Sequence, residues 1–329
     1  MADPVVSIVT PSYQQADYLD ATIQSVLRQE GVTMEYLIVD GGSTDGSQEI
    51  IEKYADQIDW WVSEPDQGQA HAINKGFRKA AGDILAWINS DDLYLPDAVS
   101  QAVEILSADR DLGMVFGNAV SADQEGRLLN HLRFGDRKVE DFLRFKMICQ
   151  PAVFMRRGVV EQVGYLDQSY QFLLDHHLWI NIARKTKIRH VNKTWAVSRY
   201  HPEAKNVYLA EKCGEEAYRI LEWAQTKPDL APLIDKHSRK IWGGAHQLNA
   251  RYLLDSQKNW KAFLLYLRAV WSWPPLFLGS WKRVIFSGLS VVGLGFLRDW
   301  YNLWQRRSQP NLQDHPDLED WPGIQSGTQ

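Results

Sequence analysis

Cysteine is scarce in this chain, which has only Cys149 and Cys213 among 329 residues. The two stand far apart and outside any CxxC spacing, so the sequence indicates neither a disulfide framework nor a zinc site. The first residues, MADPVVSIVT, lack a basic stretch followed by a long apolar one, so we expect no secretory signal there. These absences predict a cytoplasmic protein.

An excess of positive charge is also absent. The chain has 36 Lys and Arg against 41 Asp and Glu, a formal net charge of -5, so nothing indicates a nucleic-acid partner. Its 45% hydrophobic and 23% charged residues are ordinary for a globular protein with a full core. The length predicts one large domain or two.

Glycine-rich phosphate loops are missing as well. No segment has the GxGxxG or GxxxxGK[ST] pattern, which excludes the usual dinucleotide fingerprint and the P-loop. Sugar nucleotidyltransferases normally follow their first strand with a G-x-G-T-R-like loop, and here that place is taken by TPSY. Any nucleotide must therefore be held by other groups.

What the first half does contain is an alternation of short apolar runs with amphipathic segments. The runs are 5–10, 35–39, 59–63, 83–88 and 113–116, and the helix-like segments are 17–29, 45–55, 68–80 and 96–107. Continuous apolar strands between helices predict an α/β fold, a doubly wound and mostly parallel sheet with helices on both faces. Ligands of such sheets bind beyond the carboxyl ends of the strands.

Polar and acidic groups follow four of these strands. They stand in Thr10–Tyr13, Asp40–Asp45, Glu64–Gly68 and Asn89–Asp92. Taken singly, Ser12, Ser43 and Asp45 are typical turn and helix-cap residues. Together, four such loops at one sheet edge favour a nucleotide site. Because the acids would repel a bare diphosphate, the pattern predicts Mg²⁺ or Mn²⁺, which carboxylates bind and which bridges to phosphate.

The segments VSIVTPSYQQADYLDATIQSVLRQ, YLIVDGGSTDGS, DQGQAHAINKGF and GDILAWINSDD resemble family 2 glycosyltransferases, inverting enzymes of GT-A fold. QPAVFMRRGVVEQVGYLDQSYQFLLDHHLWINIA is similar to their acceptor-side segment, so the resemblance covers about residues 5–203. It implies transfer of a sugar from a nucleoside diphosphate, with UDP favoured, to the hydroxyl of a saccharide or a lipid-linked acceptor. Polysaccharide, lipopolysaccharide or glycolipid synthesis is the expected setting.

The resemblance also implies roles for individual residues. The nucleotide-sugar-binding set is Thr10, Pro11, Tyr13, Asp40, Ser43, Asp66, Gln69, Lys75 and Asp91. Asp91 and Asp92 fall on the family's DxD-like acids and are expected at the metal, with His201 as a metal ligand or phosphate contact. Asn89 stands where many relatives have a first acid, so which of the two acids ligates the metal stays open. The alternative is that both acids cap a helix beginning near Pro96.

Asp175 aligns with the family's catalytic aspartate and is expected to be the general base that takes the acceptor hydroxyl's proton. Two alternatives stand beside it: Asp175 as a helix N-cap, and proton transfer to His176 or His177, since imidazole titrates near neutral pH. Arg156 and Arg157 either add positive charge near the diphosphate or lie at the surface.

The expected catalytic domain spans residues 1–205, and the chain after it has a helical pattern. Residues 206–257 are expected to form a helical region that serves the acceptor side or packing. The apolar spacing predicts helices over 209–226 and from 232 to 268. Residues 258–307 hold eight Lys or Arg, one acid and six tryptophans. Their apolar runs, 269–281 and 284–297, flank Lys282 and Arg283 and are too short to span a bilayer.

The composition of 258–307 favours an interfacial element on the anionic inner face of the membrane, and the alternative is a hairpin packed on protein. Residues 308–329 predict a disordered tail. Two other functions stay open: a non-catalytic scaffold derived from this fold, and a sugar nucleotidyltransferase. The base and the metal acids argue against the first, and TPSY argues against the second.

Overall fold

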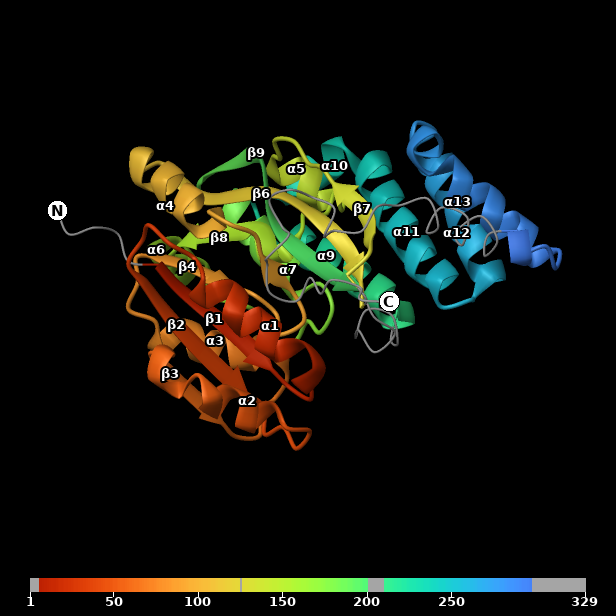
Figure 1. The fold of residues 1–329 in the computed structure, drawn as a ribbon. Helices are drawn as coiled ribbons and strands as arrows, with labels where there is room; N and C mark the ends of the chain where they lie inside the picture. Colours follow the sequence, from red (N-terminus) through yellow and green to blue (C-terminus); the bar gives the residue numbers. More distant parts are fainter. Residues whose placement is uncertain (1–5, 125, 201–209, 298–329) are drawn as a thin grey trace.

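The structure is a computed structural model and describes residues 6–124, 126–200 and 210–297 (Figure 1). These residues form a nine-stranded sheet in the order β3-β2-β1-β4-β8-β6-β9-β5, with β7 beside β6. The expected boundary at residue 205, the tail and the last part of 258–307 lie outside the described residues.

The first half of the sheet is parallel, as predicted. Its strands are β1 (Val6–Ser12), β2 (Met34–Asp40), β3 (Trp60–Ser63) and β4 (Ile84–Trp87), connected through α1 (Ala16–Leu27), α2 (Ser47–Lys53) and α3 (Gln69–Lys79). Successive residues of a strand point to opposite faces. Ile8 therefore packs in the core with α1, whereas Val9 packs in the core on the other face with α3. Burial on both faces explains the continuous apolar strands.

The second half of the sheet is mixed. It contains β5 (Leu93–Tyr94), α4 (Ala98–Ala108), β6 (Leu112–Asp123), β7 (Leu128–Leu132), α5 (Val139–Leu143), β8 (Val153–Arg156), α6 (Arg157–Val163), α7 (Leu174–Ala183) and β9 (Lys187–Tyr200). β8 runs antiparallel to β4 and β6, while β9 is parallel to β6 and antiparallel to β5. The continuous set of parallel neighbours, from β3 to β4, thus ends at β4. The strand expected at 113–116 is the start of the longer β6.

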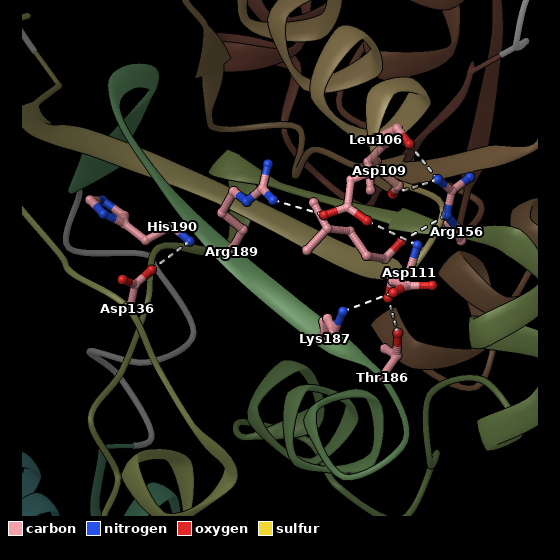
Figure 2. Close-up of polar contacts among 10 residues, drawn as sticks. Leu106, Asp109, Asp111, Asp136, Arg156, Thr186, Lys187, Arg189 and His190 are labelled. Atoms are coloured by element: carbon pink, nitrogen blue, oxygen red, sulfur yellow. Dashed lines mark hydrogen bonds and ion pairs between the residues drawn. The ribbon is translucent and has the colours of Figure 1, made fainter.

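Arg156 fixes the connection from α4 to β6 (Figure 2). Its guanidinium donates to the carbonyl oxygens of Leu106, Asp109 (3.1 Å) and Leu112 (2.7 Å). A cation suits the unpaired carbonyls at a helix C-terminus. The Asp109 carboxylate in turn accepts a hydrogen bond from Arg189 of β9 at 2.8 Å. Arg156 is thus committed to the fold at a helix end.

Five helices follow the sheet. They are α9 (Ala210–Gln225), α10 (Ala231–Lys236), α11 (Ser238–Asp255), α12 (Asn259–Ser272) and α13 (Leu276–Val291). The long helical segment expected from 232 to 268 is divided, because the chain turns at His237 and again at Gln257, which has φ 60°. α13 continues through Lys282 and Arg283, and the break between α12 and α13 lies at Trp273–Pro275.

α11, α12 and α13 pack side by side at the end of the molecule opposite β3 (Figure 1). Gly214 lets α9 approach α11 closely, since a Cβ there would lie 2.0 Å from Asn249 Oδ1. Within the residues that the structure describes, no helix combines the length and apolarity needed to cross a bilayer. The α/β class and the helical C-terminal region are therefore as the sequence predicts.

Candidate active site

A cavity of about 1560 Å³ opens beyond the carboxyl ends of β1 and β4 and extends to α11, α12 and α13. Its polar lining includes Ser12, Tyr13, Asp66, Gln69, Asn89, Asp91, Asp92, Gln150, Asp175, Arg199, Gln247, Arg251, Tyr252, Tyr266, Ser280 and Arg283. The strand-end loops and the C-terminal helices thus face one space. This is the edge at which a sheet of this kind binds its ligand.

Five of the predicted nucleotide-sugar residues line the cavity at the strand ends: Pro11, Tyr13, Asp66, Gln69 and Asp91. The Tyr13 ring is 61% exposed and offers an aromatic face for a base. Asp66 Oδ1 accepts the Gly68 N–H at 2.6 Å, so the carboxylate also shapes its own loop. Gln69 donates to Asn89 at 2.8 Å and so joins two of the four polar loops.

Asp40 and Ser43 are buried behind this wall. The Asp40 carboxylate accepts hydrogen bonds from the Gly42 and Ser43 N–H groups at 3.0 and 2.8 Å, and from the Ser43 and Ser63 hydroxyls at 2.6 Å each. These donors already satisfy most of its acceptor capacity. In this structure Asp40 therefore organises the loop, and its predicted contact with the base or ribose stays a prediction.

Thr10 and Lys75 are also set back from the cavity. The Thr10 hydroxyl is buried and lies 3.0 Å from the Tyr36 hydroxyl. Lys75 pairs with Glu64 and lies over the Trp60 ring, 6.0 Å from its centroid. Asp45 fits the simpler cap interpretation, because its carboxylate accepts the N–H groups that begin α1 and α2.

Asp91 and Asp92 both line the cavity, but they differ in burial. Asp92 is 4% exposed, and its carboxylate accepts the Arg199 N–H at 3.1 Å and the Asn89 amide at 3.3 Å. Burial raises the pKa of the Asp92 carboxyl well above its usual range, and the charge of Asp91 raises it further. The helix-cap alternative fails for both acids, because Asp97 is the residue preceding α4.

A divalent cation fits this pair in part. Two adjacent carboxylates are suitable donors for Mg²⁺ or Mn²⁺, although the charge of Arg199 also acts on both. Across residues 6–124, 126–200 and 210–297, however, no three His, Cys, Asp or Glu side chains are placed to hold a metal. His201, the third predicted ligand, lies outside the described residues. Asp91, half-exposed beside the buried Asp92, is the better placed of the two.

Arg199 is a residue of this site that the sequence interpretation did not single out. Its guanidinium donates to the carbonyl oxygens of Asp91 and Tyr18 (3.0 Å) and to the Thr22 hydroxyl (3.1 Å). Thr22 donates in turn to the Asp92 carbonyl at 2.8 Å. Arg199 thus fixes the turn that presents both acids. The sequence signal that could have identified this residue is a positive charge within the mostly apolar run TWAVSRY.

Asp175 lies at the cavity wall in the first turn of α7. The N-cap of that helix is Leu173, and the Asp175 carboxylate accepts the His176 N–H at 2.6 Å, so the N-cap alternative does not describe it. Burial raises the pKa of the Asp175 carboxyl to about 6, an effect to which the charge of Glu216 adds. Near neutral pH this carboxyl is mostly ionised and can accept a proton.

Glu216 of α9 holds the segment at the start of α7 by hydrogen bonds. Its buried carboxylate accepts the backbone N–H groups of Gln171, Phe172 and Leu173 at 2.6, 2.9 and 2.8 Å. These are donors at the start of a helix, where a carboxylate is favourable. No local sequence pattern indicates this contact, because it joins residues more than 40 positions apart.

His176 and His177 are core residues. The His176 ring is fully buried, stacks on Phe145 and lies 2.8 Å from the Phe142 carbonyl through Nε2. His177 stacks on Tyr170 with centroids 4.6 Å apart. Burial lowers the pKa of each imidazole to about 4, so both are neutral at physiological pH. Their enclosure disfavours them as the base.

Arg157 fits the surface alternative. It lies 3.6 Å from the exposed carboxylate of Asp83 and does not line the cavity.

The helix end of the cavity is lined by Gln247, Arg251, Tyr252, Tyr266, Ser280 and Arg283, from α11, α12 and α13. Burial raises the pKa of the Tyr252 phenol, and the charge of Asp175 contributes to that rise. Asp175 is therefore electrostatically close to α11. The predicted base thus lines the same cavity as the strand-end acids and these helical residues.

Comparisons with known proteins show which family this chain resembles. The family model "Glycosyl transferase family 2" matches residues 7–164. An uncharacterized glycosyltransferase of Rickettsia typhi is 26% identical over 264 residues, 78% of this chain and 81% of the relative. A PGL/p-HBAD biosynthesis glycosyltransferase of Mycobacterium bovis is 30% identical over 200 residues, 58% and 76% respectively. Three longer rickettsial relatives are 25% to 27% identical, and this chain covers 30% to 35% of their length.

Two solved structures resemble the whole fold. S. aureus TarS 1–349 in complex with UDP-GlcNAc gives a TM-score of 0.58 at 14% identity, covering 84% of this chain and 91% of that one. The mannosyltransferase PcManGT from Pyrobaculum calidifontis, in complex with GDP-Man and Mn²⁺, gives 0.57 at 19% identity, covering 95% and 88%. At these identities the likeness shows the fold, which is the expected GT-A fold.

Proposed function

This chain belongs to glycosyl transferase family 2, and we propose that it transfers a sugar from a UDP-sugar to an acceptor hydroxyl with inversion at the anomeric carbon. One observation carries the proposal: Asp91 and Asp175 line the same cavity, at the strand ends and the start of α7. A donor-side acid and a base in one space are what in-line displacement of a nucleoside diphosphate needs.

In the proposed mechanism the nucleotide lies along Pro11, Tyr13, Asp66 and Gln69. Asp175 takes the proton of the acceptor hydroxyl, whose oxygen forms a bond to the anomeric carbon. The bond from that carbon to the diphosphate oxygen breaks on the opposite face, and the diphosphate leaves with the electron pair. A pKa of about 6 keeps Asp175 mostly ionised near neutral pH while leaving it basic enough to accept the proton.

A divalent cation belongs to the proposal. Asp91, backed by Asp92, would hold Mn²⁺ or Mg²⁺, with His201 as the proposed further ligand, and the metal would neutralise charge on the departing diphosphate. The Mn²⁺ named for the Pyrobaculum enzyme supports this assignment. The UDP-GlcNAc named for TarS favours UDP over GDP. Because the other structure contains GDP-Man, GDP-sugars are also included in the experiment below.

The acceptor is proposed to belong to polysaccharide, lipopolysaccharide or glycolipid synthesis. Peripheral contact with the inner face of the membrane through the described part of 258–307 is also proposed. Exposed apolar side chains support this membrane contact. Of 13 exposed large hydrophobic side chains among the described residues, 11 lie between Trp260 and Phe296. Apolar and basic groups together suit an anionic interface.

The test is donor turnover. Purified protein is incubated with UDP-, GDP- and dTDP-sugars, with Mn²⁺ or Mg²⁺, and the released nucleoside diphosphate is measured. We expect release from one UDP-sugar, a loss of about 10²–10⁴-fold in Asp175→Asn, and weakened metal dependence in Asp91→Ala. Asp56→Asn, an exposed acid of the donor domain, is the matched control.

The anomeric configuration of the product, read by NMR, tests inversion. If the wild-type protein turns over no donor and binds no nucleoside diphosphate by calorimetry, the enzymatic proposal fails and the non-catalytic scaffold takes its place.

A further inference from the structure

The wall of the cavity is divided by charge. The acids that line it, Asp66, Asp91, Asp92 and Asp175, come from the strand-end loops and the start of α7. The helical wall carries Arg251 of α11 and Arg283 of α13, and none of its described lining residues is acidic. A substrate that fills this cavity therefore meets positive charge at the end away from the nucleotide.

Arg251 and Arg283 act on each other. Partial burial lowers the pKa of the Arg283 guanidinium, the nearby charge of Arg251 lowers it further, and Asp255 offsets this to a smaller degree. Among the described residues, neither guanidinium forms a hydrogen bond or an ion pair. Both residues are exposed, and two like charges kept close without such partners favour a bound anion.

Tyr266 of α12 gives an independent indication of a ligand. The residue is 1% exposed and lines the cavity, yet its hydroxyl has no hydrogen-bond partner in the described part of the chain. A buried hydroxyl without a partner costs about 1–3 kcal/mol, so such groups are normally satisfied. The charges of Arg251 and Arg283 both act on this phenol, and all three residues line the same cavity.

From this arrangement we propose that Arg251, Arg283 and Tyr266 bind a phosphate group carried by the acceptor. The inference rests on the proposed function, because it takes the strand ends as the donor side and Asp175 as the base. Guanidinium groups and a hydroxyl are donors suited to phosphate oxygens, and three of them from three helices form a convergent set.

Neighbouring side chains suit an acceptor whose phosphate is attached to an apolar chain. Phe277, Leu278 and Trp281 of α13 are exposed close in sequence to Ser280 and Arg283, which line the cavity. A soluble phosphorylated sugar presents the same phosphate chemistry without the chain. The two sources differ in how much of the affinity the apolar part supplies.

The test measures binding by calorimetry without any donor, using farnesyl phosphate, farnesol and inorganic phosphate as probes. We expect farnesyl phosphate to bind wild-type protein, and Arg251→Gln/Arg283→Gln to weaken it at least about tenfold. Tyr266→Phe should weaken it less. Lys282→Gln is the matched control, since it removes the same charge from the residue next to Arg283 but outside the cavity lining. Circular dichroism checks that each variant is folded.

The probes separate the sources. Inorganic phosphate binding as tightly as farnesyl phosphate, and lost in the arginine variant, supports a soluble phosphorylated acceptor, whereas a clear gain from the farnesyl chain supports a lipid. Equal binding of farnesol, unchanged binding in the double variant, or no binding of any phosphate probe overturns the proposal.

UDP binding, measured in parallel, reports on the donor site separately. If the double variant loses UDP affinity as well, the arginines serve the donor and the acceptor assignment is wrong. If wild-type protein binds farnesyl phosphate but not UDP, the proposed function fails while the phosphate site stands.

Discussion

Glu216 lies behind Asp175: its carboxylate holds the three backbone N–H groups that precede α7, and its charge helps to raise the pKa of Asp175. One acid on a C-terminal helix thus positions the predicted base and adjusts its proton affinity. Both effects can be measured through the pH dependence of turnover.

We expect kcat/KM of the wild-type enzyme to rise with pH through about 6. The base must be ionised to accept a proton, and burial sets the pKa of Asp175 at about 6, so activity is lost below that pH. Cys149 and Tyr252 lie near this carboxyl, but burial raises the pKa of both groups, so neither ionises in this range. A pH–rate profile from 4.5 to 8.5 gives the value. An acid limb near 4 would contradict the assignment.

Glu216→Gln should shift that acid limb to lower pH and also lower kcat. The charge that raises the pKa of Asp175 is removed, and an amide cannot accept all three N–H bonds as a carboxylate does. The lost bonds should cost about 1–3 kcal/mol of the free energy of unfolding, measured with urea. Glu215→Gln, its exposed neighbour on α9, is the control. A fall in stability with an unmoved limb would limit Glu216 to a structural role.

Asp175→Asn should stabilise the fold at pH 7 while slowing transfer by about 10²–10⁴-fold. The folded-state pKa of about 6 exceeds the usual 3.8, so the protonated carboxyl is favoured on folding. Its contribution is fully present below about pH 4 and is lost as pH rises through 6. A neutral amide avoids that loss, and we expect a gain of about 1–2 kcal/mol at pH 7, discounted because the group is half-buried. Thermal unfolding at pH 4.5 should show a smaller difference, and a lower melting temperature at pH 7 would count against the burial argument.

The fold could be predicted from the sequence where local pattern determines it. Continuous apolar runs ending in polar loops identified β1 to β4 and the edge where Asp66 and Asp91 lie. Residues such as Glu216 and Arg199 could not be predicted, because their roles depend on contacts between distant elements. Tertiary packing also decided between alternatives that the sequence left open, as when the rings around His176 and His177 made them core residues.

The helical region was harder to divide. Apolar spacing indicated helices but did not locate their ends. Lys282 and Arg283, which separate two apolar runs, lie inside α13, since long basic side chains can extend to the surface from within a helix. The break between α12 and α13 at Trp273–Pro275 has a simple local cause, because proline is tolerated at a helix start and not in its interior.

Arg199→Lys should weaken both stability and donor binding. The guanidinium donates to the Asp91 and Tyr18 carbonyls and to Thr22 in a planar arrangement that an ammonium cannot reproduce. We expect a loss of about 2–3 kcal/mol in the free energy of unfolding, with a raised KM for the donor because the Asp91 turn loosens. Arg189→Lys, on the same strand and in a surface ion pair with Asp109, should leave both unchanged. Equal effects of the two variants would show that the site turn does not depend on Arg199.

Trp271→Ala/Leu278→Ala should reduce binding to anionic vesicles without reducing turnover of a soluble donor. The two side chains are 84% and 79% exposed on the α12–α13 surface, so their removal leaves the core intact. Each large apolar side chain transferred from water contributes about 1.5–3 kcal/mol, so the double variant should bind at least about tenfold more weakly. Co-sedimentation with phosphatidylglycerol and phosphatidylcholine vesicles measures this, and added salt should weaken the anionic case further because basic residues accompany the apolar ones. Wild-type protein that fails to sediment with either vesicle would leave this surface to a protein contact instead.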